Sequence, residues 1–333
     1  MLRLQRALIT GVSGFAGGFL AEHLLDRGDE VLGCSLDGRW EKSSPEALRD
    51  RVELLPWDVG DPGGMPDETR RRILDFRPDC IYHLAAMSVP DDCGEDEAVP
   101  VATAVNVAGT RRVMELAASL DAGPRVLFAS SSHVYAPVSA ESPQVDENAP
   151  VGPWRGYGRT KLAAEREVRR AVRHRGCDAV IVRSFQHTGP RQNPRMMLPE
   201  WARQFATGGS EPVQVLNRNA RIDLSDGRDV VRAYRLLVER GRSGEAYNVG
   251  SGISRRSGDV LELLRQMADP RREIVELRPG LKQDPIADVS RLVRCTDWRA
   301  TIGLETTVAD TLAWWRWFES APTHREPSQE SES

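Results

Sequence analysis

The chain has 333 residues, 40% of them hydrophobic, a length that exceeds one ordinary hydrophobic core and predicts two lobes. Its formal net charge of −4 excludes the strongly basic surface of a nucleic-acid-binding protein. No window approaches the roughly 18 consecutive apolar residues of a membrane span, so we expect a cytoplasmic protein without a membrane partner.

Short apolar runs alternate with amphipathic stretches over the first half of the chain. This alternation predicts an α/β protein with a Rossmann-type, doubly wound parallel sheet, whose ligands bind at the carboxyl ends of the strands. We expect residues 1–184 to form a dinucleotide-binding domain, with later sheet elements from about 226–252. Residues 185–320 should form mainly a smaller C-terminal substrate-binding lobe, and the polar residues 321–333 a disordered tail. The runs begin at Arg6, Glu30, Arg51, Asp79, Arg125 and Asp178.

The first run leads into the glycine-rich segment ITGVSGFAGGFL, residues 9–20. Its three spaced glycines suit a tight turn, a close backbone approach and close packing of the following helix on the sheet. The amino end of that helix offers free amides and a positive dipole end to a pyrophosphate. The segment therefore predicts dinucleotide binding, with Gly11, Ser13, Gly14, Phe15, Ala16 and Gly17 as the contacting residues.

The end of the second run bears on the choice between NAD and NADP. An acidic residue here would bind the adenosine ribose and reject a 2′-phosphate. The sequence has Ser35 at this position, with Asp37 two positions later and Arg39 beyond it. Ser35 and Arg39 suit a 2′-phosphate whereas Asp37 opposes one, so we expect NADP, with NAD as the alternative.

Two further segments follow strand ends. Asp58 stands just past the third run, where its carboxylate suits the adenine amino group and Val59 suits the adenine ring. Asp58 is equally compatible with a plain turn. The small residues that end the fourth run let the backbone approach the cofactor, and they include Leu84, Ala85 and Ala86.

The segment YGRTK places Tyr157 and Lys161 four residues apart, on one face of a predicted helix. A nearby ammonium favours phenolate over phenol, so the pair predicts a tyrosine with a lowered pKa that exchanges protons near neutral pH. The five cysteines stand at wide spacings without a CxxC pair, and we expect neither disulfides nor a metal site.

With its glycine loop, the serines at 130–132 and the Tyr157–Lys161 pair in this order, the chain resembles the extended short-chain dehydrogenase/reductase superfamily, the NAD-dependent epimerase/dehydratase family. The resemblance implies a catalytic triad beside the nicotinamide. It implies that Tyr157 transfers the proton and that Ser131 positions the substrate oxygen. Lys161 would lower the pKa of Tyr157 and bind the nicotinamide ribose. Ser131 is chosen because it stands four residues before Tyr135, as in similar family motifs.

The reaction type is read from the neighbouring positions. In the resembling dehydratases an acidic residue stands where this chain has His133, so the resemblance argues against 4,6-dehydration. We name Ser132, His133, Gln186, Arg221 and Arg278 as substrate-binding candidates, the two arginines for a diphosphate. A purely structural role for His133 and surface ion pairs for the arginines remain alternatives.

Segments of the second half are similar to GDP-4-keto-6-deoxy-D-mannose reductases, notably RSFQHTGPRQ from Arg183 and YNVGSGI from Tyr247. The chain departs from that pattern at Gln186, which replaces an asparagine, and at Arg191, which replaces a glycine. The implied reaction is NAD(P)H-dependent reduction of the C4 ketone of a nucleotide-linked sugar. The alternatives are an NDP-sugar 4-epimerase that retains NAD and a non-catalytic dinucleotide-binding member.

The resemblance also implies a homodimer built as a four-helix bundle. The helices concerned are expected in residues 97–120 and 158–176. Candidate contacts on their outer faces are Val101, Val105, Leu162 and Val172, although some of these must face the protomer's own sheet. A monomer with a solvated arginine-rich face is the alternative.

Overall fold

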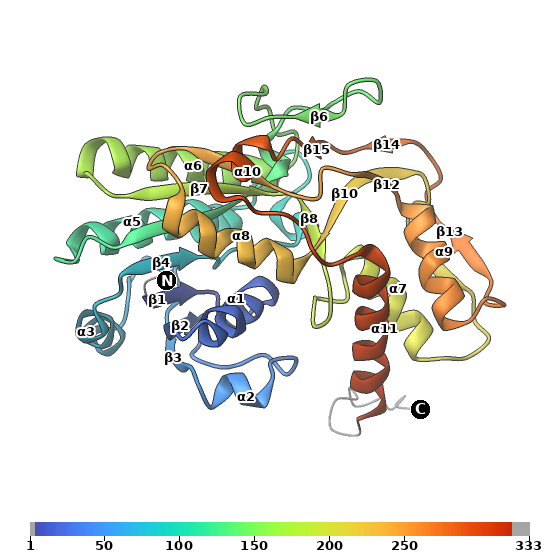
Figure 1. Cartoon of the computed structure of the whole chain (residues 1–333), viewed down its shortest axis with the longest axis horizontal. Coiled ribbons are helices and arrows are strands. Elements are labelled where there is room, and N and C mark those ends of the chain that lie inside the picture. The colour runs from blue at the N-terminus through green and yellow to red at the C-terminus, as the bar shows by residue number, and fades with distance from the viewer. Residues whose placement is uncertain (1–3, 322–333) are drawn as a thin grey trace.

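The computed structural model of the chain describes residues 4–321, so almost all of the predicted disordered tail lies outside the described residues (Figure 1). Its main feature is a seven-stranded, all-parallel sheet in the order β3-β2-β1-β4-β5-β7-β11. The order reverses between β1 and β4, which creates the topological switch point typical of dinucleotide-binding folds. The predicted fold class is confirmed. The strands are β1 (Arg6–Thr10), β2 (Glu30–Ser35), β3 (Glu53–Pro56), β4 (Cys80–His83), β5 (Arg125–Ser131), β7 (Ala179–Ser184) and β11 (Ala246–Val249).

Helices cover both faces of this sheet because its strands are apolar on both sides. In β1, Ala7 and Ile9 point into the core beneath α1 and α8, whereas Leu8 points into the core beneath α3, α5 and α6. The helices are α1 (Phe15–Asp26), α2 (Glu46–Arg49), α3 (Asp67–Phe76), α5 (Gly109–Ser119), α6 (Gly156–Arg175), α8 (Gly227–Arg240) and α10 (Ser290–Thr296). Within residues 4–321, no helix is long and apolar enough to cross a bilayer.

The helix expected in residues 97–120 begins at Pro100 and contains a wide turn. It consists of α4 (Pro100–Thr103), the π-helical turn η2 (Ala104–Ala108) and α5. Asn106 in this turn is buried, and its amide group bonds both backbone groups of Met87 and the hydroxyl of Thr160. The wide turn thus ties the loop after β4 to α6.

A second lobe has its own apolar core, formed mainly by helices that Figure 1 shows together on one side of the molecule. Buried Trp201 and Trp315 belong to it. The helices are α7 (Met197–Ala206), α9 (Ser257–Ala268) and α11 (Leu304–Ser320). The strands are β8 (Gln186–Thr188), β9 (Val213–Val215), β10 (Ala220–Asp226), β12 (Ser254–Arg256), β13 (Ile274–Glu276) and β14 (Lys282–Gln283). The short pair β6 (Gln144–Val145) and β15 (Ile286–Ala287), with the 3-10 turns η1 (Pro90–Cys93) and η3 (Ser132–Val134), completes the described elements.

Close packing of α1 on the first turn depends on glycine at one position. A Cβ atom built on Gly17 would lie 2.1 Å from the backbone oxygen of Gly11, whereas one on Gly18 would meet nothing nearer than 3.9 Å. The two neighbouring glycines therefore have opposite consequences when they are replaced.

We predict that Gly18→Ala raises the free energy of unfolding by about 0.5 to 1 kcal/mol, because alanine is the better helix former. Gly17→Ala should lower it by about 1 to 3 kcal/mol, because backbone must move to admit the methyl group. Urea unfolding followed by circular dichroism measures both. Equal effects of the two substitutions would contradict the close approach at Gly17.

Candidate active site

The three predicted catalytic residues lie together where β5 ends and α6 begins. Ser131 is the last residue of β5, and Tyr157 and Lys161 lie on the first two turns of α6. Ser131 Oγ accepts a hydrogen bond of 3.2 Å from the amide of His133, and the Ser131 hydroxyl is near enough to Tyr157 to lower the pKa of that phenol. A serine and a tyrosine hydroxyl thus converge on one point, as positioning of a substrate oxygen requires.

Lys161 is almost fully buried beneath Tyr157. Its Nζ donates a 2.9 Å hydrogen bond to the backbone oxygen of Ala129 and lies 5.9 Å from the centre of the Tyr157 ring. Burial lowers the pKa of Lys161 to about 8 because the charged form loses hydration. The ammonium therefore titrates close to physiological pH.

The expectation that Tyr157 has a lowered pKa is wrong for the protein without ligands. Burial raises the pKa of Tyr157, and the hydrogen bond from Ser131 offsets only part of that effect. The sequence gives the four-residue spacing, but the lysine ammonium is directed to Ala129 and not to the phenol oxygen. Tyr157 is consequently a neutral phenol, which can donate a proton.

The glycine loop fits a dinucleotide pyrophosphate. Gly11 has a φ of +73°, in the left-handed region that favours glycine. A Cβ there would lie 2.7 Å from the amide nitrogen of Ala85, so the first turn and the loop after β4 approach closely. Gly14 begins α1 without a side-chain cap and no acidic residue occupies the first turn, which leaves the amides of the helix terminus available for an anion.

The remaining loop candidates lie around this turn. Ser13 and Gly14 line a small hollow next to Ser43 and Ser44, and Phe15 at the start of α1 stacks on His187 with ring centres 5.9 Å apart. Ala16 follows in the first turn of α1, while Leu84, Ala85 and Ala86 form the partly buried stretch directly after β4.

The residues after β2 and β3 are held by local hydrogen bonds. Ser35 is buried and donates to the backbone oxygen of Arg39, whose amide donates to Asp37. The guanidinium of Arg39 is exposed and lies 3.9 Å from the Asp37 carboxylate. Asp58 accepts a hydrogen bond from the amide of Gly60, so it forms the turn that the sequence allowed as an alternative. The neighbouring Val59 is buried. Arg39 is thus held only by a weak, solvent-screened ion pair.

The substrate candidates divide into an inner and an outer group. Ser132 is buried beside the triad, and the His133 ring meets that of Tyr157 edge-on with centres 5.4 Å apart. Burial lowers the pKa of His133, against the opposing charge of Asp284. Gln186 donates a 2.8 Å bond to the same Asp284, and its buried Oε1 has no partner among the described residues.

The two arginines proposed for a diphosphate belong to the outer group. Arg221 and Arg278 are both exposed on the second lobe. The backbone oxygen of Arg221 accepts the amide of Asp284, whereas Arg278 lies on the loop after β13. The structure connects Arg221 to the inner group through Asp284 and leaves Arg278 apart from it.

Several residues with a place at this site were missed in the sequence. Asp284 accepts both Gln186 and Lys282, and nothing in the local sequence marks it because its position depends on the strand pairing of β14 with β10. Arg191 lines the hollow beside the glycine loop. Its Cζ lies 3.9 Å from the centre of the Phe19 ring, and its Nη1 and Nη2 both donate to the carboxylate of Glu22. Its φ of +71° explains why glycine suits this position in similar sequences. The replacement of that glycine by Arg191 was the feature of the sequence that could have marked this residue.

A model of the NAD dependent epimerase/dehydratase family matches residues 7–250. The chain is 25% identical over 319 residues to GDP-6-deoxy-D-mannose reductase from Pseudomonas aeruginosa, an alignment that covers 93% of this chain and 97% of that protein. It is 29% identical over 322 residues to a dTDP-glucose 4,6-dehydratase from Streptomyces griseus, with 94% and 95% of the two chains covered.

Solved structures agree with this placement. The structure of RMD from Pseudomonas aeruginosa complexed with NADPH matches with a TM-score of 0.78 at 25% identity, covering 94% of this chain and 99% of that chain. The fold is shared with UDP-glucose 4-epimerase from Thermotoga maritima, solved with UDP-glucose, at a TM-score of 0.81 and 22% identity, with 94% and 99% of the chains covered. Because the family model spans most of the chain, this protein belongs to the NAD dependent epimerase/dehydratase family.

Proposed function

We propose that the protein reduces the 4-keto group of a nucleotide-linked 6-deoxy sugar, similar to GDP-4-keto-6-deoxymannose, with NAD(P)H as the hydride donor. The observation that carries this proposal is that Ser131, Tyr157 and Lys161 lie together where β5 ends and α6 begins, with Lys161 fixed on the backbone oxygen of Ala129. Reduction of a ketone needs a proton donor at the developing alkoxide, and a phenol with a raised pKa is in that state at neutral pH.

Each residue of the triad has a distinct part in this reaction. The glycine loop would hold the cofactor, whose nicotinamide would supply a hydride to the carbonyl carbon. Tyr157 gives its proton to the carbonyl oxygen, and Ser131 holds that oxygen by a hydrogen bond. Lys161, fixed on Ala129, provides a positive charge that stabilises the tyrosinate left after proton transfer. The carbonyl group becomes an alcohol, and no group leaves the sugar.

The residues beside the triad support reduction over dehydration. Elimination of water needs a further acid and base next to the tyrosine. This chain has Ser132 and His133 there, and burial lowers the pKa of the imidazole, so His133 is neutral near pH 7. A neutral imidazole and the free Oε1 of Gln186 suit hydrogen bonds to sugar hydroxyls.

The epimerase alternative uses the same triad but keeps NAD bound through oxidation and re-reduction. It would show as nicotinamide absorbance in purified protein to which no cofactor was added. A dinucleotide-binding protein without catalysis would bind cofactor yet turn over no nucleotide sugar. We also propose that the protein acts in the cytoplasm.

We predict that Tyr157→Phe lowers kcat for the reduction of GDP-4-keto-6-deoxymannose by about 10²-fold or more, because only the proton-transferring hydroxyl is removed. The dissociation constant of the cofactor should change little. Tyr82→Phe, in the buried core of β4, is the matched control and should retain near wild-type turnover. Near wild-type kcat in Tyr157→Phe would refute the assignment.

For the cofactor, we predict a lower dissociation constant for NADPH than for NADH. Arg39→Ala should weaken NADPH binding by about tenfold and leave NADH unaffected, because the exposed guanidinium is available to a 2′-phosphate. Fluorescence titration of the reduced cofactors measures both constants. Equal affinities, or an NADH preference that survives Asp37→Ala, would contradict this prediction.

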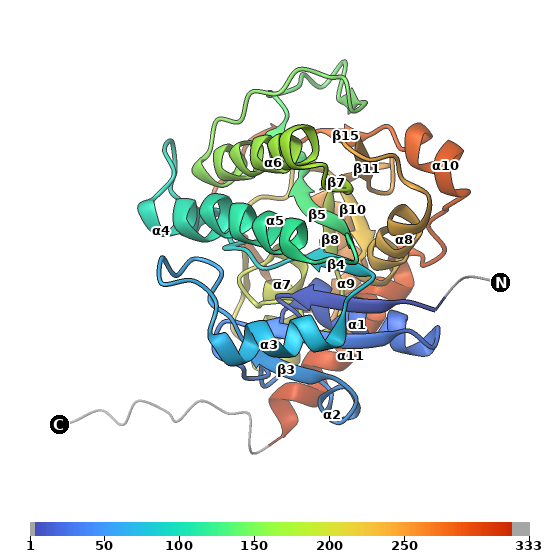
Figure 2. The ribbon, with the colours of Figure 1, turned by 90° about the vertical axis from the view of Figure 1, so that its left-hand side faces the viewer.

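We further propose a homodimer formed by α5 and α6, which lie side by side on one face of the molecule (Figure 2). The contact residues expected there need correction, since Val105, Leu162 and Val172 pack largely against the cores of their own protomer. Val101 is 55% exposed and remains available. The face is otherwise rich in Arg–Glu pairs such as Arg111–Glu167 and Arg175–Glu115.

Light scattering at micromolar concentration should therefore give twice the 37.0 kDa mass of one chain. Val101→Asp should shift the mass toward the monomer, since a two-fold interface places the introduced charge on both partners. A mass of 37.0 kDa for the unaltered protein would exclude the dimer.

A further inference from the structure

Glu165 lies in the interior of the protein, on α6 one turn beyond Lys161. Its side chain has no exposed surface. The carboxylate accepts a bond of 2.7 Å from Ser130 Oγ, two bonds of 2.9 Å from Nε and Nη2 of Arg183, and one of 2.9 Å from Arg169. Both oxygens are thus held from several directions.

Arg183, on β7, is also buried, and each of its three guanidinium nitrogens donates a hydrogen bond. Besides its two bonds to Glu165, it donates through Nη1 to the backbone oxygen of Glu147, at 3.2 Å. Its guanidinium lies 4.9 Å from the ring centre of Tyr135. Burial alone would raise the pKa of Glu165, but the hydrogen bonds and charges of Arg183, Ser130 and Arg169 together hold it below the usual value. The pair is therefore ionised and directional.

The bond to Ser130 is one of three consecutive contacts between β5 and α6. The backbone oxygen of Ala129 accepts a hydrogen bond from Lys161, the hydroxyl of Ser130 donates to Glu165, and Ser131 lies near Tyr157, whose pKa it lowers. Two of these contacts involve the proposed catalytic residues. The middle one, between them on the strand, does not touch the reacting groups.

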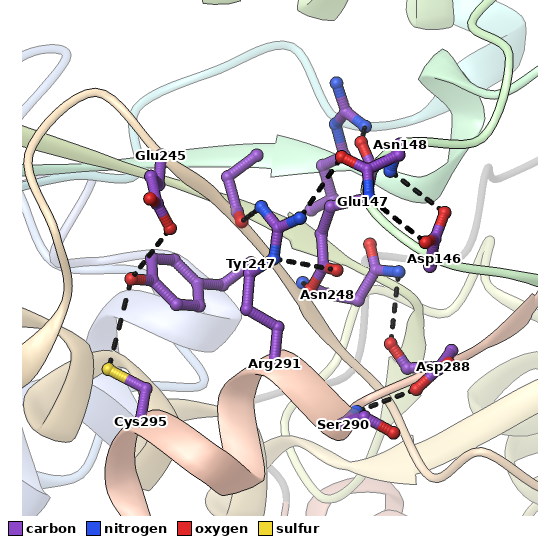
Figure 3. Close-up of polar contacts among 12 residues, drawn as sticks. Asp146, Glu147, Asn148, Glu245, Tyr247, Asn248, Asp288, Ser290, Arg291 and Cys295 are labelled. Atoms are coloured by element: carbon purple, nitrogen blue, oxygen red, sulfur yellow. Dashed lines mark hydrogen bonds and ion pairs between the residues drawn. The ribbon is translucent and has the colours of Figure 1, made fainter.

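The network continues outward from Arg183 to the C-terminal part of the chain. Glu147 accepts the amide of Asn248 at 2.8 Å and pairs with Arg291 of α10 at 3.2 Å, as Figure 3 shows. Arg291 also donates to the backbone of Ala246 in β11. Arg183 therefore connects to α6 through Glu165 and to the loop before α6 through Glu147.

We propose that Glu165 is a positioning residue of the catalytic centre, which holds α6 in register with the end of β5 through Ser130 and Arg183. It thereby sets the places of Tyr157 and Lys161 relative to Ser131. This inference rests on the proposed function of those three residues.

A buried ion pair is a poor device for stability alone, because desolvation costs about as much as the charges gain. Its bidentate geometry does specify position, since Nε and Nη2 of the planar guanidinium donate two bonds to the two carboxylate oxygens in a fixed relative direction. Displacing a catalytic group by about 1 Å can cost about 10²-fold in rate. Positional control is therefore the larger expected effect.

The test compares Glu165→Gln with Glu167→Gln, a control on the same helix whose carboxylate pairs with Arg111 and Arg170 on the helix surface. Because Glu167 lies on the proposed dimer face, light scattering first checks that this control keeps the mass of the unaltered protein. We expect Glu165→Gln to lower kcat by about 10- to 100-fold with KM changed less than about twofold. Glu167→Gln should leave both unchanged. Circular dichroism confirms that each variant is folded.

A second readout needs no substrate. The chain has three lysines, Lys42, Lys161 and Lys282, so selective ¹³C labelling gives resolvable resonances whose titration reports the Lys161 pKa. Burial lowers it to about 8, and displacement of α6 should raise it toward 10.5. Loss of the negative charge of Glu165 alone would lower the pKa of Lys161 further, because that charge favours the ammonium. A rise in this pKa therefore identifies a change of position.

Ser130→Ala provides a milder variant that keeps the ion pair intact, and it decides the matter if Glu165→Gln does not fold. Glu165→Asp should recover part of the kcat lost in Glu165→Gln. A folded Glu165→Gln or Ser130→Ala variant with unchanged kcat and unchanged Lys161 titration would overturn the proposal. If Tyr157→Phe retains activity while Lys161 shifts in these variants, the proposed reaction fails but the positioning by Glu165 stands.

Discussion

The seven strands of the main sheet run parallel, so their carboxyl ends meet at one edge. Ser35 and Ser131 are the last residues of their strands, and Gly11, Asp58 and the loop from Leu84 follow strand ends at the same edge. Helices on both faces exclude solvent from the rest of the sheet. This geometry brings residues from distant parts of the chain to a common edge of the sheet.

Two opposing forces determine protonation at that site. Burial penalises every charge, raising the pKa of Tyr157 and lowering those of Lys161 and His133. The hydrogen bond from Lys161 to the backbone oxygen of Ala129 then decides which atom the ammonium faces. The neighbourhood of a phenol and an ammonium therefore does not by itself produce a phenolate. The surrounding dielectric matters as much as the distance.

Local signals in the sequence sufficed for the sheet, the glycine loop and the Tyr157–Lys161 pair, because each depends on spacing within one strand or one helical turn. The Asp284 contacts were not predictable, since they arise from pairing of β14 with β10 far along the chain. Helical periodicity also could not say which apolar side chains of α6 face outward. Leu162 and Val172 proved to pack on their own protomer.

The chain passes repeatedly between the two lobes. It leaves the sheet after β7, returns for α8 and β11, leaves again for β12, and returns with α10 before ending in α11. Because the chain crosses between the lobes several times, a single flexible hinge cannot separate them. Neither lobe corresponds to a continuous stretch of sequence that recombination could exchange as a module. New substrate preferences in such an architecture must instead arise by substitution within the existing lobe, against a fixed catalytic sheet.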